Sequence, residues 1–533
     1  MKNEKLYDGI TGIREDIVER ADVHEFKKKK RMTWQKWTAL AACFCIVIGG
    51  VYGAARLGIL GGAGSSAPGI GGGAGGGGNT GITYMSYAGP VFPLTAEGDA
   101  SGITAERNID FDFSPYEAVN ESYETATGET RSYTRYETEA IVTDGYTLTN
   151  TTEEDITVSG IYPFAGSFDN AVMEMPAITV DGTRIDTELF AGPFSGGYRD
   201  VTGATAGGRW NIDNLNSWEQ YRELLSDGSY MVRSFDEWPN LNLPVIVYEI
   251  SDRAVQTGVE AGVADLKLSF VMDSEETTIL TYGFNAGWNN QDTGEYARGT
   301  SVPESFNPDY GESAYLIVLG EDVENCTLQG WSDGWSKEND AVTGTLTRYE
   351  TTLGEILYNL MCLYINDVDA MYDSDVGPFL WGNITEDMYF GAISELMYDY
   401  GKLSDDTAER YDDGMLEDMF SEARVMQRVM YLRFSVTIPA GGSVDVIAQM
   451  TKDASIDFIG ANKDRNGYDM VTQLGSNLTF TSQIASISNT DNIEIIDQSF
   501  GFDLANGITE VELDMSVAHY WLEVRKLPQE ETP

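Results

Sequence analysis

The feature that most constrains this chain is an uncharged apolar run of 19 residues, Trp37–Ala55, with the sequence WTALAACFCIVIGGVYGAA. A helix rises about 1.5 Å per residue, so a run of this length spans the hydrocarbon core of a membrane. The basic cluster KKKKR precedes it at 27–31, whereas Arg56 is the one basic residue close behind it. Because the side richer in Lys and Arg stays in the cytoplasm, we predict a single-pass cell-membrane protein with a cytoplasmic N-terminus and an extracellular C-terminal region.

A cleaved signal peptide is the alternative explanation of the same run. Its small-residue cleavage site would be Gly53-Ala54-Ala55, and its basic leading region would be 36 residues long, longer than is typical. In both cases the part of the chain that follows Arg56 is exported.

Charge divides unevenly at the apolar run. Residues 1–56 carry 11 basic and 7 acidic side chains, which leaves 23 basic and 78 acidic side chains for the rest of the 533 residues. Binding to nucleic acid depends on Lys and Arg that displace counterions from phosphates, so we expect no nucleic-acid partner. The exported part also disfavours anionic lipids and anionic wall polymers, and it attracts cations.

Composition and periodicity divide the chain into five predicted parts. These are a cytoplasmic tail with a short amphipathic helix (1–36), a transmembrane helix (37–56), a Gly-rich flexible linker (57–81), an exported β-rich domain (82–320) and a second β-rich unit (321–533) with a helical insertion at about 351–428.

Alternation of apolar and polar residues indicates strands in both β-rich parts. In AITVDGTRID, at 177–186, two alternating arms flank Asp181-Gly182, a strong hairpin signal. The segment at 429–450 alternates on both sides of a turn at Pro439–Gly442. We therefore predict a mainly β fold of antiparallel β-sandwich-like units with a helical insertion, preceded by one transmembrane helix.

Helical spacing interrupts this pattern twice. NSWEQYRELL, at 216–225, predicts a short helix, and three stretches between Thr351 and about Arg428 have apolar residues at three and four spacing. The Met and Tyr stripe of the longer insertion is more typical of a packing face than of a cofactor site.

Residues that could carry out catalysis are scarce in the exported part. Its one histidine, His519, falls in a predicted strand, where a structural role is the commoner one. The chain has no G-x-S-x-G, H-E-x-x-H or C-x-x-C motif, so we predict no catalytic residues and no enzyme activity. Cys326 and Cys362 either pair in an oxidising space or remain buried thiols.

One polar segment resembles part of a calcium-binding loop. NKDRNGYDMVTQ, at 462–473, places Asn462, Asp464 and Asn466 at early ligand positions, but Gln473 stands where a bidentate Glu is required. A polar turn is the simpler interpretation, and calcium is the one cofactor that the sequence suggests.

The tail carries a resemblance to a known group of proteins. MKNEKLYDGITGIREDIVERAD, the lysine run, KWTALAAC and an exported domain together resemble uncharacterised single-pass membrane proteins of Gram-positive bacteria, some of which look like anti-sigma factors. The resemblance implies a cytosolic segment that holds a partner such as an alternative sigma factor. Zinc-type anti-sigma factors use a His and a C-x-x-C pair, whereas this tail has His24 and no Cys, so no site residue is carried over.

Taken together, these features predict a membrane-anchored, non-enzymatic extracytoplasmic binding or sensing protein. The membrane is contacted through Trp37 to Ala55, the tail acts as an anti-sigma-like regulator on a cytosolic partner, and the outer region binds an unidentified extracellular ligand. The alternative is a surface adhesion or carbohydrate-binding module whose tail is only an anchor.

Overall fold

A computed structural model describes residue 84 and most of residues 86–527. The undescribed residues are 1–83, 85, 117, 125–129, 137, 170–174, 194–214, 216, 257–263, 291, 303–312, 333–334, 372–383, 400–402, 404–414, 458–461 and 528–533. The predicted cytoplasmic tail, transmembrane helix and linker therefore lie outside the described residues. Among the helices that are described, none combines the length and the apolar character needed to cross a bilayer.

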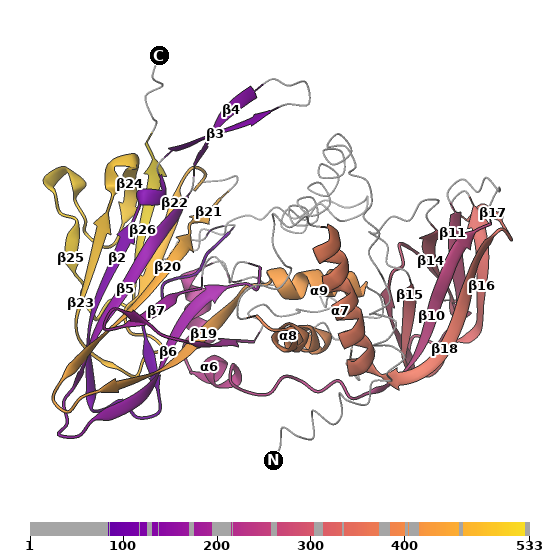
Figure 1. Cartoon of the computed structure of the whole chain (residues 1–533), viewed down its shortest axis with the longest axis horizontal. Helices are drawn as coiled ribbons and strands as arrows, with labels where there is room; N and C mark the ends of the chain where they lie inside the picture. The colour runs from indigo at the N-terminus through magenta and orange to yellow at the C-terminus, as the bar shows by residue number, and fades with distance from the viewer. Residues whose placement is uncertain are drawn as a thin grey trace. The chain divides into compact units, whose positions relative to one another are not determined.

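By its contacts the chain divides into two units, residues 1–79 with 120–134, and residues 80–119 with 135–533. Two strands fall largely in the first unit and pair as a two-stranded sheet, β3 (Ala118–Glu124) and β4 (Thr130–Tyr136). All elements described below belong to the second unit. It is mainly β, with several antiparallel sheets and a few helices, which confirms the predicted fold class at this level (Figure 1).

The largest sheet, sheet 1, has seven strands. Their order across the sheet is β25 (Glu510–Glu512), β23 (Thr479–Ser488), β2 (Ile103–Asp112), β5 (Glu139–Asn150), β20 (Ser443–Asp453), β7 (Ala177–Val180) and β8 (Thr183–Arg184). Neighbouring strands are antiparallel except β2 and β23, which are parallel. Both predicted β-rich parts, 82–320 and 321–533, thus contribute strands to one sheet. The predicted hairpin at Asp181-Gly182 joins β7 to β8 and is confirmed.

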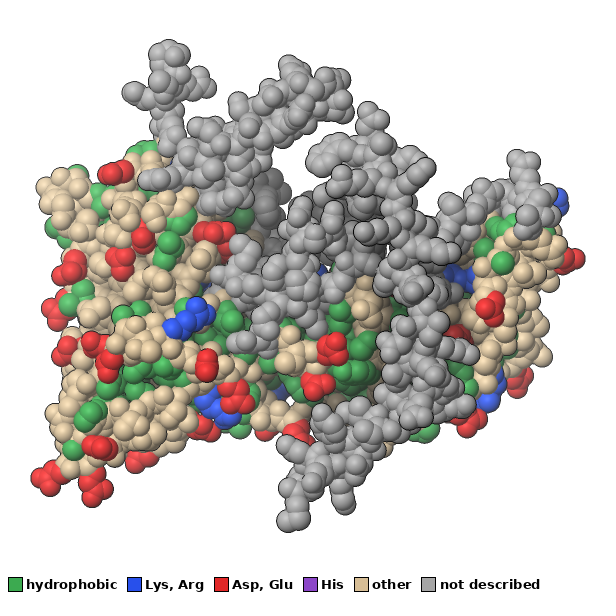
Figure 2. Space-filling view, in the orientation of Figure 1, with side chains coloured by type: hydrophobic (Ala, Val, Ile, Leu, Met, Phe, Trp, Pro, Cys, Tyr) green, Lys and Arg blue, Asp and Glu red, His purple; other side chains and the backbone are tan. Residues whose placement is uncertain are grey.

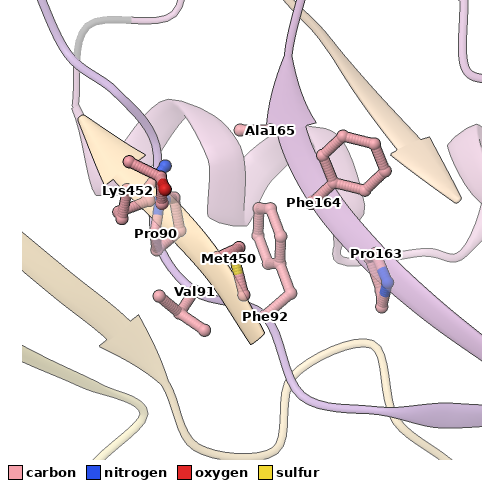
Figure 3. A pocket seen from close by; sticks show the side chains of 9 residues that line it. Pro90, Val91, Phe92, Pro163, Phe164, Ala165, Met450 and Lys452 are labelled. Carbon is pink, nitrogen blue, oxygen red and sulfur yellow. The ribbon is translucent and has the colours of Figure 1, made fainter. Parts of the chain in front are cut away.

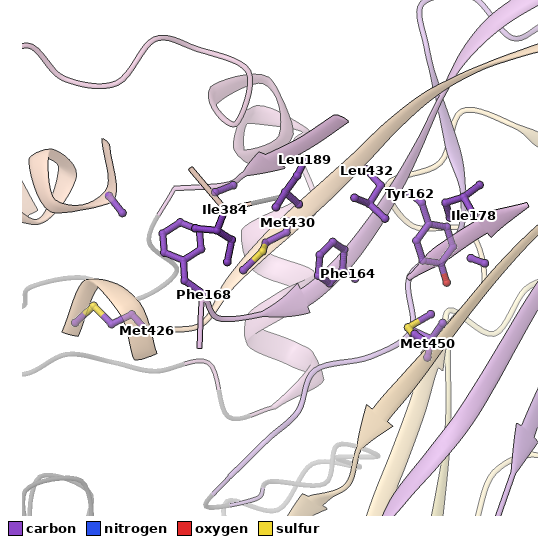
Figure 4. Close-up of a cluster of buried hydrophobic side chains, with 14 of the residues drawn as sticks. Tyr162, Phe164, Phe168, Ile178, Leu189, Ile384, Met426, Met430, Leu432 and Met450 are labelled. Carbon is purple, nitrogen blue, oxygen red and sulfur yellow. The ribbon is translucent and has the colours of Figure 1, made fainter. Parts of the chain in front are cut away.

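Sheet 2 packs against sheet 1 and completes the first sandwich. Its strands are, in order, β1 (Thr95–Glu97), β6 (Ile156–Gly166), β19 (Arg428–Ile438) and β9 (Glu188–Ala191). The arms at 429–450 are strands β19 and β20, as alternation indicates, but the turn at Pro439–Gly442 carries the chain from sheet 2 to sheet 1. Figure 4 shows the core between them, with Phe164 and Leu432 from sheet 2 near Ile178 and Met450 from sheet 1.

Sheet 3 lies beside the first sandwich and contains the end of the chain. Its strands are β21 (Ser455–Ile456), β22 (Asn466–Val471), β26 (His519–Lys526) and β24 (Ile493–Gln498). The first described residues run along β22, where the Val91 amide donates to the Asp469 carbonyl at 2.9 Å. The Tyr84 hydroxyl also donates to Glu523 of β26 at 2.8 Å. The beginning and the end of the described chain are thereby held together.

A fully buried ion pair lies in the core of the first sandwich. Arg107 of β2 donates from Nε and Nη2 to the two carboxylate oxygens of Asp144 of β5, at 2.7 and 2.9 Å. Tyr146 and Tyr162 donate to the same carboxylate, and Arg107 Nη1 donates to the Val471 carbonyl in sheet 3. Burial lowers the pKa of Arg107, but Asp144 together with Tyr146 and Tyr162 outweighs burial and raises the pKa, so the guanidinium stays charged.

The segment 244–352 forms a second sandwich from two sheets. Sheet 4 is ordered β12 (Thr277–Tyr282), β15 (Ala314–Gly320), β10 (Pro244–Val255) and β18 (Val342–Thr352). Sheet 5 is ordered β13 (Ala286–Asn290), β14 (Glu295–Val302), β11 (Ala264–Val271), β16 (Glu324–Ser332) and β17 (Lys337–Glu338). A separate apolar core lies between them, with Leu266 and Leu268 of β11 facing Leu316 and Val318 of β15.

Helices occur at the segments where the three- and four-residue spacing predicts them, and one further short helix, α6 (Ser229–Arg233), was not predicted. The predicted helices are α5 (Trp218–Leu225), α7 (Leu353–Met371), α8 (Glu386–Asp399) and α9 (Leu416–Val425), the last three inside the predicted insertion. Buried side chains of α7, α8 and α9 share one apolar cluster with Leu280 and Ile317 of sheet 4. The Met and Tyr side chains of this insertion serve largely as a packing face, as expected.

Candidate functional site

The three calcium-loop candidates lie in and beside the turn that enters β22. The Arg465 amide donates to the Asn462 carbonyl at 3.0 Å, and Asp464 has a φ of 66°. Asn466 is the first residue of β22 and is buried. Across the described residues, His, Cys, Asp and Glu side chains form no group of three or more that could hold a metal ion. Calcium binding at this turn stays a prediction.

His519 lies in β26, as the alternating pattern predicts. Its Nε2 lies 2.7 Å from Asp469 Oδ2, and its ring stacks on Trp218 with centroids 4.8 Å apart. Tyr87 donates to the same Asp469 oxygen, and burial together with Asp469 raises the pKa of Tyr87 well above its ordinary value. These contacts join the first described segment, α5 and sheet 3, which is the role of a structural histidine.

Cys326 in β16 and Cys362 in α7 are both free thiols, so the alternative in which they pair is wrong. Burial raises the pKa of each thiol to about 11. Because the thiolate is the reactive form, neither cysteine is activated as a nucleophile.

Two hollows differ greatly in size. The smaller lies between the sheets of the first sandwich, near Phe92, Phe164 and Met450, and measures about 10 Å³ (Figure 3). That is room for about one water molecule. The larger measures about 430 Å³ and is a groove formed by β9, residues 233–239 after α6, and α8. Its size is in the range of small-molecule sites.

We call this larger hollow the acidic groove. Its lining residues are Leu189, Phe190, Ala191, Pro193, Arg233, Ser234, Phe235, Asp236, Glu237, Trp238, Pro239, Thr385, Asp387, Met388 and Glu395. The lining thus combines aromatic rings with four carboxylates and one guanidinium.

The aromatic wall is held rigidly. Phe190 and Phe235 lie with ring centroids 4.7 Å apart, and the Arg433 guanidinium lies 4.5 Å from the centroid of Phe190. Arg433 is itself bound to Glu188 at 2.6 Å. The Arg433 guanidinium therefore already makes a cation–π contact with this aromatic pair. The same kind of contact is open to a cationic ligand.

Trp238 closes the other side of the groove by lying directly on α8. A Cβ added at Gly391 would come within 2.3 Å of the Trp238 ring, so only glycine allows this approach. The start of α8 is capped by Thr385, whose hydroxyl accepts from the Met388 amide at 3.1 Å. Asp387 lies in the first turn of α8, where the helix dipole favours a carboxylate.

Glu395 and Arg428 form the innermost part of the site. Glu395 lines the groove, and Arg428 is completely buried behind it, with Nη1 3.4 Å from Glu395 Oε2 and 3.2 Å from the Gly192 carbonyl. Arg428 Nε and Nη2 find no acceptor in the part of the chain that the structure describes. A buried guanidinium with such incomplete bonding is costly, and costly polar groups are retained most often where they serve a function.

The charges around the groove decide which ligands it suits. Its four carboxylates outweigh Arg233 and the buried Arg428, which leaves an excess of two negative charges. Figure 2 shows acidic side chains scattered over this described face, with fewer Lys and Arg. Phosphate or carboxylate ligands would be repelled, whereas an ammonium or guanidinium group would be attracted by both the carboxylates and the aromatic faces.

This groove was not predicted from the sequence. A usable signal was present in SFDEWPN, at 234–240, where two acids stand between aromatic residues and a proline. The partners of this segment, Phe190 and Asp387, are far from it in the sequence, so local pattern alone cannot assemble the site.

Comparisons with protein-family models, with curated proteins and with solved structures find no match for this chain.

Proposed function

We propose that this chain is a membrane-anchored, non-enzymatic extracytoplasmic binding protein whose acidic groove takes a small ligand with positively charged amino groups. The observation that carries the proposal is the lining of the groove, where four carboxylates surround Phe190, Phe235 and Trp238. Carboxylates provide ionic attraction, and ring faces attract the same cations through their quadrupoles. The volume of about 430 Å³ suits a short polyamine or a basic side chain of a peptide.

The membrane topology belongs to the same proposal. The basic cluster at 27–31 and the apolar run Trp37–Ala55 support an N-terminus in the cytoplasm and a ligand-binding region outside the cell. The tail then engages a cytosolic partner such as a sigma factor, as its resemblance to anti-sigma-like proteins of Gram-positive bacteria implies. Pull-down with residues 1–36 from cytosol tests this half, and recovery of no specific protein would remove it.

The groove is tested by titration calorimetry of spermidine into the full-length protein in detergent micelles. We expect a micromolar dissociation constant that weakens as salt is raised, because salt screens ionic attraction. The double variant Asp236→Asn/Glu237→Gln should weaken binding at least tenfold. The variant Trp238→Ala should also weaken it, through loss of the aromatic wall.

A matched control separates the groove from the general acidity of the protein. Glu153→Gln/Glu154→Gln removes the same number of charges from the exposed turn before β6. Its affinity for spermidine should equal that of the wild type. Equal weakening in both double variants, or wild-type affinity in the groove variant, would assign spermidine binding to the surface charge as a whole and overturn the proposal.

A further inference from the structure

The outer face of sheet 5 gathers indole side chains from three places in the second sandwich. Along β11, Leu266 and Leu268 point into the apolar core, so the alternating residues Asp265, Lys267 and Ser269 face outward. Strand register places Trp331 of β16 opposite Asp265. It places Ala297 of β14 opposite Ser269. Trp288 of β13 is in turn opposite Ala297. Trp288 and Trp331 therefore share the outer face.

Trp335, in the turn after β16, is laid onto the same face. A Cβ added at Gly299 of β14 would come within 2.3 Å of the Trp335 ring, and Gly299 is the outward-facing partner of Lys267. The Lys267 ammonium lies 5.0 Å from the ring centroids of both Trp331 and Trp335. Trp335 takes a φ of 66°, which non-glycine residues rarely adopt. Backbone strain of this kind is found preferentially at binding sites.

Trp288 stands apart from this Lys and Trp stack. Its side chain is 48% exposed on the edge strand β13, and its neighbours on the outer face, Ala286 and Ala297, are small. Packing between Lys267, Trp331 and Trp335 explains those three side chains structurally, but it gives no role to Trp288. An exposed indole beside fixed indoles and a floor of small residues forms a flat apolar platform.

The charges of this face select among the ligands that stack on indoles. Lys267 lies at the centre of this face, and its ammonium already makes cation–π contacts with both Trp331 and Trp335. The remaining outward residues include the uncharged Ser269, Thr327, Gln329 and Asn290, together with the carboxylates Asp265, Glu295 and Glu338, which outnumber Lys267. The carboxylates repel anionic chains and, with the amides and hydroxyls, form hydrogen bonds with hydroxyl groups. A neutral ligand rich in hydroxyl groups fits this combination.

The separation of the indoles indicates the length of the ligand. Trp288 and Trp331 lie three strand spacings apart across the sheet, about 14 Å, and four residues apart along the strands, about 13 Å, so the two positions are separated by roughly 19 Å. This distance exceeds the width of one sugar ring. From these features we infer that the outer face of sheet 5 binds a neutral polysaccharide chain, with successive sugar rings stacked on Trp288 and on the Trp331 and Trp335 pair. The inference is independent of the ligand proposed for the acidic groove.

The test is native gel electrophoresis of the full-length protein in detergent, with a soluble neutral polysaccharide in the gel. We use three such polymers, a β-glucan, a xylan and a galactomannan, and expect at least one to retard the wild-type protein. The variant Trp288→Ala should lose at least tenfold in affinity for that polymer. Because Trp288 is exposed at an edge strand, this variant should keep its fold, which circular dichroism verifies.

The acidic groove and the outer face of sheet 5 provide matched controls for each other. Trp238→Ala should weaken spermidine binding and leave retardation by the polysaccharide unchanged, whereas Trp288→Ala should do the reverse. High salt should weaken spermidine binding and not retardation. Absence of retardation in all three polymers, or equal retardation of wild type and Trp288→Ala, would overturn the inference. The inference would also be overturned if the protein self-associates, Trp288→Ala abolishes this self-association, and no polysaccharide retards the protein. A second protein chain would then occupy the outer face of sheet 5.

Discussion

The two sandwiches of this protein are built in opposite ways. The first combines strands from both ends of the described chain, and a charged pair, Arg107 and Asp144, lies in its core. The second is formed by the continuous segment 244–352, and its core is largely apolar, with Arg298 of β14 as a buried charged side chain on the inward-facing register. The difference teaches that the sandwich closed by distant strands is specified here by directional polar bonds, whereas the sandwich of consecutive strands relies mainly on the alternation of apolar residues.

The largest effect should come from breaking the charged pair. Asp144→Ala leaves Arg107 buried without its counter-ion, and loss of one partner of a buried pair costs about 3–5 kcal/mol. Urea unfolding of the full-length protein measures this loss. The double variant Arg107→Met/Asp144→Leu should be less destabilised than Asp144→Ala, because it leaves no buried charge. A loss below about 1 kcal/mol for Asp144→Ala would remove the contrast between the two cores.

An apolar truncation in the second sandwich should have the next largest effect. Leu268 of β11 is completely buried, and Leu268→Ala should cost about 3 kcal/mol through lost burial and the cavity left behind. Hydrogen exchange locates the damage. Amides of β10, β11 and β14 should exchange faster, while those of β2, β5 and β20 keep their protection. Equal acceleration in both sandwiches would show that they unfold as one unit.

A pH-dependent effect is expected where α9 meets sheet 4. Gly283, after β12, donates to Glu417 Oε1 at 2.6 Å, and burial raises the pKa of Glu417 from 4.5 to about 7. The folded state thus holds a proton that the unfolded state releases, so stability should fall as pH rises from about 4.5 to about 7. The side chain is partly exposed, so we expect on the order of 2 kcal/mol.

Glu417→Gln tests this dependence because it keeps the acceptor for Gly283 and removes the titration. The slope of the unfolding free energy against pH should flatten in the variant. Asp418, whose pKa burial also raises, contributes a smaller slope of the same sign in both proteins. Parallel pH profiles for wild type and variant would exclude Glu417 as the source.

The smallest effect should come from the hairpin turn of sheet 1. Gly182 has a φ of 73°, and a Cβ at this position would meet no atom within 4 Å. Gly182→Ala should therefore cost only the backbone strain, about 1 kcal/mol. A thermal melt measures it as a small fall in midpoint. Gly441, at the turn between β19 and β20, also has a positive φ and open space around it. Gly441→Ala is therefore the matched substitution for Gly182→Ala.

Sequence patterns predicted local structure well and distant pairing poorly. Alternation identified strands β7, β19 and β20, and Asp181-Gly182 identified a hairpin, because these signals depend on neighbouring residues. The placement of β19 and β20 in different sheets was not predictable, since a turn at Pro439–Gly442 suits a hairpin equally well. Asp144 occupies a core position of β5 that alternation would reserve for an apolar residue, and only its contact with Arg107 explains it.

The parallel pairing of β2 with β23 has a consequence for how the protein is made. Thr104 pairs with Thr479, so sheet 1 cannot close until nearly the whole chain has been synthesised. During synthesis β2 and β5 have unpaired edges, which are the kind of surface that aggregates. The second sandwich, whose strands are close in sequence, can fold in the meantime. Folding of this chain should therefore depend on chaperones that protect the strands made first.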